Sequence, residues 1–495
     1  MIKRLRPRLV RPIAASVIIV LAALPPAVAQ QQPDSSTRQL PEMRSTVPLL
    51  GMRHGEDFRP SAWRLAPEYA PDVYEAPLPD GRPTRVAFVS DVDSIAFLVE
   101  EGREYDFVVV KDGVRHWTRI VGRRFVPRAR FDSAYQAANR GRIEIEIPEA
   151  YELANVAIAL TPTAIETYGL VYQKSQYYEE MRRWFDPHAG HPVIAQLDSV
   201  LRLDANRYHS LKMNGRAFEL DAEGRLVKSA VYDRTGFDGE PSNVLEPFAA
   251  GLEDFARASN FRRFYAAHRD LYAGQIAFYR DTANIAAMQT WLSNHFPGAK
   301  PYDSYRIVFS PLVAYNQSAT WFESDGFSEL MPHVNFPYAQ DLQERHGTTA
   351  LSDSAAVLLR GIIVFTEINH GYINPEADRY AERIAAAVSN RDLWVDPAMG
   401  PNYYGGNGIF TEYMNWALIN LRFADFAPPA ERDSLIARID RSMVEGRKFP
   451  HFAEFSRFLV PLYVGRGERT LAQLYPEIIA WFERENAGGA ARRVR

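Results

Sequence analysis

The chain has 495 residues, a formal net charge of −4 and no cysteine. The lack of cysteine excludes disulfides, thiol nucleophiles and cysteine-ligated zinc or iron–sulfur sites. A mildly acidic chain lacks the basic surface with which proteins bind nucleic acid, so no nucleic-acid partner is expected. With 46% hydrophobic residues, a chain of this length can bury a sizeable core without covalent cross-links.

The amino terminus has the three parts of a secretory signal. Five Lys and Arg residues lie before residue 12, an apolar run of twelve residues covers 13–24, and Ala27-Val28-Ala29 forms a small-x-small cleavage site. A membrane-spanning helix needs about 20 apolar residues, so this run is too short to be an anchor. We therefore predict that the signal peptide, residues 1–29, is removed after Ala29 and that the mature protein is periplasmic or secreted. No membrane span is expected after cleavage.

Composition and periodicity divide the mature chain into four parts. Residues 30–67 are rich in Gln, Pro, Ser and Thr and are expected to be a disordered lead-in. Short β-branched and aromatic runs, two of them joined by the turn dipeptide Asp112-Gly113, predict an antiparallel β module over residues 68–170. Helical periodicity dominates residues 171–485, and residues 486–495 are expected to be a flexible tail. The predicted class is α+β: a small amino-terminal antiparallel β module followed by a mostly helical domain with a short sheet.

One predicted helix, residues 358–375, carries most of the chemistry. Ser352 is expected to cap its start and Pro375 to end it. The segment is almost wholly apolar and should be buried, yet four polar residues interrupt it: Thr366, Glu367, Asn369 and His370. At about 100° per residue, four polar side chains share one arc of this helix: Thr366, Glu367, His370 and Asn374.

A buried carboxylate and imidazole on one helix face need partners. Left bare, such groups cost several kcal/mol, so they must be paired, hydrogen-bonded or bound to a metal ion. The Glu-x-x-His spacing of Glu367 and His370 is the one that metal sites on helices use. A lone histidine in a buried helix can also be a satisfied core residue.

Residues 364–375, Val-Phe-Thr-Glu-Ile-Asn-His-Gly-Tyr-Ile-Asn-Pro, resemble the motif helix of an uncharacterised bacterial family of gluzincin-like zinc metallopeptidases. That helix reads His-Glu-Phe-x-His-x-Phe-x-Asn-Pro, and the resemblance extends at low identity over about residues 170–425. It implies a metallopeptidase-like domain and an exported zinc-dependent hydrolase acting on a peptide or protein. In such a site Glu367 would be the general base, and His370 and Glu412 would be zinc ligands. Thr366 stands where the family has its first zinc-binding histidine.

Two interpretations follow from that substitution. Glu367 becomes a ligand, giving a Glu367/His370/Glu412 site for zinc or another divalent ion. Otherwise the metal is lost, and the polar cluster is a hydrogen-bonded relic in a catalytically inactive binding protein of the cell envelope. Several residues could assist either site: Thr366, Asn369 and Asn374 from the helix, His333 as a replacement ligand or substrate contact, and Tyr404 as an oxyanion donor.

Overall fold

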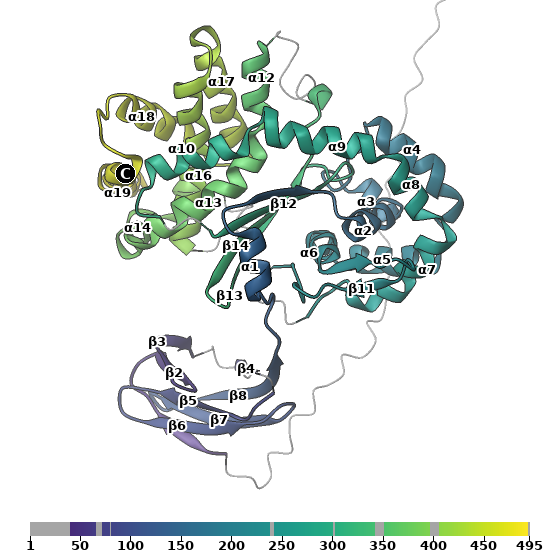
Figure 1. Ribbon diagram of the computed structural model, residues 1–495. Helices are drawn as coiled ribbons and strands as arrows, with labels where there is room; N and C mark the ends of the chain where they lie inside the picture. Colours follow the sequence, from purple (N-terminus) through teal and green to yellow (C-terminus); the bar gives the residue numbers. More distant parts are fainter. Residues whose placement is uncertain are drawn as a thin grey trace, which may run out of the picture. The chain divides into compact units, whose positions relative to one another are not determined.

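The computed structural model describes residues 40–65, 72–79, 81–237, 242–299, 302–341, 351–396 and 405–493. The predicted signal peptide lies outside these residues. The chain divides into two compact units, Met1–Val126 and Pro127–Arg495 (Figure 1). Small sheets come first and helices dominate afterwards, so the predicted α+β class is confirmed. Within the described part of the chain, no helix is long and apolar enough to cross a membrane.

The first unit is a sandwich of two four-stranded sheets, ordered β1-β7-β8-β4 and β3-β2-β5-β6. Its strands are β1 Glu42–Arg44, β2 Leu49–His54, β3 Asp57–Arg64, β4 Asp72–Pro79, β5 Thr84–Val89, β6 Ser94–Val99, β7 Glu104–Lys111 and β8 Val114–Phe125. Phe88 of one sheet and Phe107 of the other lie 5.0 Å apart between ring centres in the shared core. The predicted turn is confirmed, because Asp112 and Gly113 join β7 to β8 with φ of 51° and 79°. Positive φ at both residues matches the twist of a two-residue hairpin.

The first unit differs from the predicted β module at both of its ends. Strands β1–β3 occupy residues 42–64, which composition assigned to the lead-in, and the unit ends at Val126 rather than at residue 170. Strand β9, Ile143–Glu146, also falls within the residues predicted for the β module. However, β9 pairs in parallel with β12, far along the chain, so it belongs to the second unit. Composition does not reveal a pairing partner at that sequence distance.

The second unit is mostly helical. Its amino-terminal helices are α1 Ser133–Asn139, α2 Glu149–Ala159, α3 Pro162–Glu166, α4 Gln176–Phe185, α5 Pro192–Leu203, α6 Arg207–Asn214, α7 Ala249–Ala258, α8 Phe261–Ala267, α9 Arg269–Ala277 and α10 Ile285–His295. Its carboxyl-terminal helices are α12 Asp353–Arg360, α13 Ile362–Asp378, α14 Ala381–Ala387, α15 Arg391–Trp394, α16 Gly405–Phe426, α17 Pro429–Arg441, α18 Phe452–Val464 and α19 Leu471–Arg493. The last helix thus extends through the predicted flexible tail as far as Arg493.

A mixed sheet lies among these helices in the order β13-β14-β12-β9. Its strands besides β9 are β12 Ser304–Ser310, β13 Ser318–Ser324 and β14 Phe327–Asn335; a separate hairpin holds β10 Phe218–Leu220 and β11 Leu226–Lys228. Successive side chains of a strand point to opposite faces. Leu330 and Val334 therefore face the main core, which contains Ile368 of α13, and Met331 packs in a second cluster on the other face. Helix α13 thus lies against β14 (Figure 1).

The motif helix differs from its predicted bounds in two respects. Ser352 caps α12, accepting a hydrogen bond from the Ala355 amide as predicted. Gly361 then separates α12 from α13, and a Cβ there would meet the Met288 Cε at 2.8 Å. Pro375 does not end α13, which continues to Asp378. Because Glu376 and Ala377 are buried, packing outweighs the hydrogen bond that proline cannot donate.

Candidate functional site

The two helices that carry the predicted site residues pack side by side. Glu367 and His370 lie on α13, and Glu412 lies on α16. The charges of His370 and Glu412 are close enough to shift the pKa of Glu367 in opposite directions. The structure therefore brings the three residues into one cluster, here called the α13–α16 cluster.

Both ring nitrogens of His370 have hydrogen-bond partners. The Asn415 Nδ2 lies 2.9 Å from the His370 Nε2, and the His370 Nδ1 lies 3.3 Å from the Asn374 Oδ1. Asn369 fixes the same part of α16 by donating to the Asn415 carbonyl oxygen at 3.1 Å. The amide of Asn415 donates, so the Nε2 lone pair, which would bind a metal, is engaged by α16.

The carboxylate of Glu412 forms an ion pair. Arg447, which follows the π-helical turn η6 Ser442–Gly446, places its Nη1 at 2.5 Å from the Glu412 Oε1. The Trp416 indole donates to the same oxygen at 3.0 Å, and the Arg447 guanidinium lies 4.3 Å from the centre of the Trp416 ring. The side chain of Glu412 is only 12% exposed, so this pair is largely removed from water.

Glu367 is buried, and its carboxylate forms no hydrogen bond or ion pair with another described residue. Burial raises its pKa above the ordinary range, and the nearby Glu412 adds to this effect. The positive charges of Arg447 and Lys212 act in the opposite direction. Lys212 is itself fully buried on α6, where its Nζ donates to the Asn316 carbonyl oxygen at 2.9 Å.

The donor set of this cluster does not fit a zinc ion. The Thr366 hydroxyl donates to the Ile363 carbonyl oxygen of its own helix at 2.8 Å. His370 and Glu412 already bind neighbouring side chains. A metal ion would have to compete with the Arg447 guanidinium for Glu412. Among the described residues, no group of three or more His, Asp or Glu side chains is arranged to hold a metal ion. Catalytic zinc needs three good protein ligands with an open fourth position.

One of the predicted accessory residues, His333, does not join the cluster. His333 lies on β14 with the parity of Met331, on the face opposite Leu330 and Val334, and its ring centre lies 5.7 Å from that of Tyr151. Neither ring nitrogen of His333 has a hydrogen-bond partner within the described ranges. Burial lowers its pKa well below the usual value, and the charge of Lys212 adds to this. Tyr404 lies outside the described residues.

A cavity of about 270 Å³ adjoins the cluster. Arg447 and Trp416, the two partners of Glu412, form part of its wall. Sequence reasoning missed Arg447 and Asn415. Asn415 stands three residues after Glu412, so helical spacing from Glu412 could have identified it. Arg447 lies beyond another helix and carries no comparable signal.

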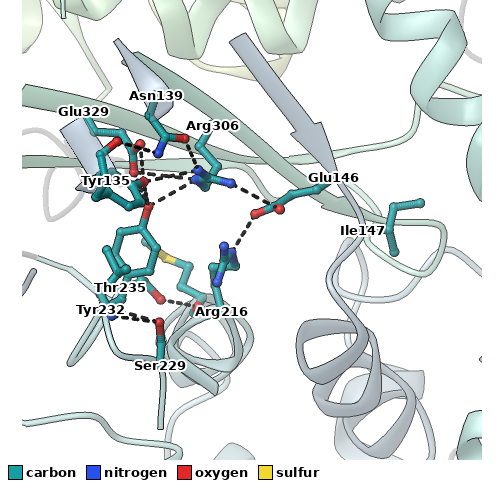
Figure 2. Close-up of polar contacts among 12 residues, drawn as sticks. Tyr135, Asn139, Glu146, Ile147, Arg216, Ser229, Tyr232, Thr235, Arg306 and Glu329 are labelled. Atoms are coloured by element: carbon teal, nitrogen blue, oxygen red, sulfur yellow. Dashed lines mark hydrogen bonds and ion pairs between the residues drawn. The ribbon is translucent and has the colours of Figure 1, made fainter. Parts of the chain in front are cut away.

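A second charged cluster lies on the other face of the sheet and is fully paired (Figure 2). Arg306 lies 3.3 Å from Glu146 and 3.7 Å from Glu329, and Arg216 lies 2.6 Å from Glu146. The Tyr135 hydroxyl donates to Glu329 at 2.7 Å. Two guanidiniums balance two carboxylates, so this network ties α1, β9, β12 and β14 together as a structural polar core.

Comparison of the chain with protein-family models, with curated proteins and with solved structures finds no match. The resemblance of residues 364–375 to the gluzincin-like family therefore stays a prediction that rests on those residues.

Proposed function

We propose that this chain is an exported, metal-independent binding protein of the cell envelope, built on a metallopeptidase-like arrangement. The observation that carries the proposal is the ion pair between Arg447 and Glu412. In this proposal the guanidinium supplies the positive charge that a metal ion supplies in the enzymes that the motif resembles.

Charge balance supports the proposal. Two carboxylates, Glu367 and Glu412, share a largely buried site, and like charges there would repel. Arg447 offsets this repulsion without a metal ion. A metal ion would have to displace Arg447 from Glu412 and so break a largely buried ion pair, which costs free energy.

The cavity beside Arg447 supports a binding role. Ligand sites are concave, mostly apolar and carry a few polar groups that orient the ligand. The cavity has this composition, since isoleucine side chains at 362, 363 and 439 line it together with Arg447 and Asn335.

One observation favours a second candidate, the metal-dependent peptidase. The buried carboxylate of Glu367 has a raised pKa and no hydrogen-bond partner among the described residues, as a general base can have. The peptidase interpretation also needs Glu412 to exchange Arg447 for a metal ion.

Melting the mature protein with and without a strong chelator, and with added zinc, separates the two candidates. The proposal predicts the same melting temperature in all three samples and no cleavage of unfolded proteins. A melting temperature lowered by the chelator, together with zinc-dependent cleavage, would establish the peptidase instead, because a bound ion stabilises the folded state.

A further inference from the structure

A second cavity, of about 530 Å³, lies beside the loop that follows α3. The polar and aromatic residues of its wall include Glu166, Thr167, Tyr168, Tyr172, Gln173, Lys174, Tyr315 and Asp341. Tyr315 and Asp341 also line the cavity beside Arg447, so the two cavities adjoin. The second cavity therefore extends the binding site towards the surface of the loop.

The ring of Tyr168 stands at this cavity almost fully in solvent. Tyr168 is 86% exposed, the highest value among the large hydrophobic residues that the structure describes. Its ring centre lies 5.6 Å from that of Tyr315, and the two ring planes are inclined at 42°. Most of the ring surface therefore stays open, and a ligand can cover it.

Hydrogen bonds fix the loop that carries this tyrosine. The carbonyl oxygen of Gly169 accepts from the Tyr315 amide at 3.0 Å, and that of Leu170 accepts from the Ala314 amide at 3.2 Å. The side-chain amide of Asn316 donates to both of these carbonyl oxygens, at 2.8 and 2.9 Å. Gly169 has a φ of 88°, which residues with a side chain rarely adopt. The chain thus holds an exposed aromatic ring in a fixed place beside a cavity.

The polar groups of the wall offer both donors and acceptors. Glu166, Gln173 and Lys174 are exposed, so a ligand can reach them. A carboxylate accepts hydrogen bonds, an ammonium group donates them, and a side-chain amide does both. The two carboxylates, Glu166 and Asp341, outnumber the one ammonium group of Lys174, so an acidic ligand is disfavoured. Hydroxyl groups, which donate and accept, match this wall.

We propose that this cavity binds a non-acidic oligosaccharide of pyranose rings with equatorial substituents. One sugar ring stacks on Tyr168, and its hydroxyl groups bind the polar residues of the wall. The C–H bonds on the face of such a sugar ring carry partial positive charge and pack on the negative face of an aromatic ring. The inference rests on the proposed function, since it names the class of ligand for that binding role.

Two sources offer this chemistry: a short free oligosaccharide and a longer glycan chain. A chain has room to continue past Tyr315 into the cavity beside Arg447, where Tyr338 and Trp416 line the wall. A short oligosaccharide fills the second cavity alone.

Calorimetric titration of the full chain in the presence of chelator tests the inference. The probes are cellobiose, cellohexaose, the β-1,4-linked hexamer of mannuronate, and sorbitol, which has the hydroxyl groups without the ring. We expect cellohexaose to bind at least about fivefold more tightly than the mannuronate hexamer, whose carboxylates meet those of Glu166 and Asp341. Sorbitol should not bind.

Cellobiose and cellohexaose distinguish the two sources. A chain offers several registers to one site, so only an affinity more than about tenfold above that of cellobiose identifies the longer chain. A smaller ratio identifies the short oligosaccharide.

Variants locate the stacking contact. Tyr168→Ala should weaken the binding of cellohexaose at least about fivefold, because the ring surface is lost, whereas Tyr168→Phe keeps the ring and should bind nearly as the parent does. Leu203→Ala, at a residue of α5 that is 84% exposed, is the matched control and should bind as the parent does.

The inference is overturned if no probe binds saturably, if sorbitol or the mannuronate hexamer binds as tightly as cellohexaose, or if Tyr168→Ala binds like the parent. It is also overturned if Tyr168→Phe loses as much affinity as Tyr168→Ala, since a hydroxyl contact would then replace the stacking. The comparison of probes needs no variant, so it holds even where a variant does not fold. Because chelator is present and no cleavage is scored, failure here is distinct from the discovery of a bound metal.

Discussion

The Arg447 guanidinium and the Glu412 carboxylate form an ion pair, Nη1 to Oε1, at 2.5 Å. Glu412 is the residue that the motif resemblance assigns to a metal. A protein side chain therefore engages this carboxylate. In the same α13–α16 cluster, His370 binds Asn415 and Asn374, and Glu367 lies near both His370 and Glu412. The predictions that follow test this arrangement and the buried groups around it.

Removing Arg447 should expose the cost of an unpaired Glu412. We expect Arg447→Met to lower the free energy of unfolding by about 2–4 kcal/mol, since a largely buried carboxylate loses its counter-charge. Glu412→Gln in the same chain should recover at least about 1 kcal/mol, and this coupling isolates the pair from the other contacts of Arg447. Urea denaturation of the parent, of both single variants and of the double variant measures this coupling free energy. Additive effects of the two substitutions would contradict the assigned pairing, and Arg457→Met, which removes an arginine that is 72% exposed on α18, should change little.

The buried carboxylate of Glu152 should make the protein less stable as the pH rises towards neutrality. Glu152 accepts a hydrogen bond from the Tyr177 hydroxyl at 2.7 Å, and burial raises its pKa to about 7. An unfolded glutamate loses its proton near pH 4.3, so between about pH 4.3 and 7 the folded state binds more protons. The free energy of unfolding therefore falls as the pH rises through this window. Glu152→Gln should remove this part of the fall, and an unchanged pH dependence in the variant would contradict the assignment.

Lys212 should act in the opposite sense at higher pH. Burial lowers the pKa of Lys212 to about 7, whereas an unfolded lysine keeps its proton to about pH 10.4. Between these values the unfolded state binds more protons, so the free energy of unfolding rises with pH. Denaturation of the parent and of Lys212→Met across this range should show the rise only in the parent. A rise of equal size in Lys212→Met would show that another group is responsible.

Several elements of this fold follow from local sequence. The Asp112-Gly113 turn needs φ above zero at both positions, and Asp and Gly tolerate it. The Ser352 cap and the helix around Glu412 likewise depend on nearby residues. Pro375 was assigned wrongly as the end of α13, because burial of the next two residues maintains the helix. Local signals succeed where the stabilising partner lies within a few residues.

The parts of the site that the sequence does not predict depend on contacts between distant segments. Glu367, His370 and Glu412 were expected to converge, and the packing of α13 on α16 brings them together. The residue that decides most about the cluster is Arg447, whose role appears only when the helices are packed. A guanidinium 35 residues after its carboxylate partner has no local pattern to mark it.

His370 offers a direct probe of the hydrogen bonds in the cluster. Because the Asn415 amide donates to the Nε2, a neutral His370 ring should carry its proton on the Nδ1, where the Asn374 oxygen accepts it. Nitrogen NMR of histidine-labelled protein distinguishes the two tautomers. We expect Asn415→Ala to change the tautomer balance of His370 and leave His191, the cap residue of α5, unaffected. A ring protonated on the Nε2 in the parent would mean that the Asn415 amide is turned the other way.

The central claim is that a guanidinium, and not a metal ion, balances the charge of the α13–α16 cluster. The most direct test is elemental analysis of the protein and of its His370→Ala variant, both purified without chelator from zinc-supplemented cells. The account predicts far less than one zinc or other transition-metal ion per chain, with no difference between the two proteins. One metal ion per parent chain that is lost in His370→Ala would contradict the account.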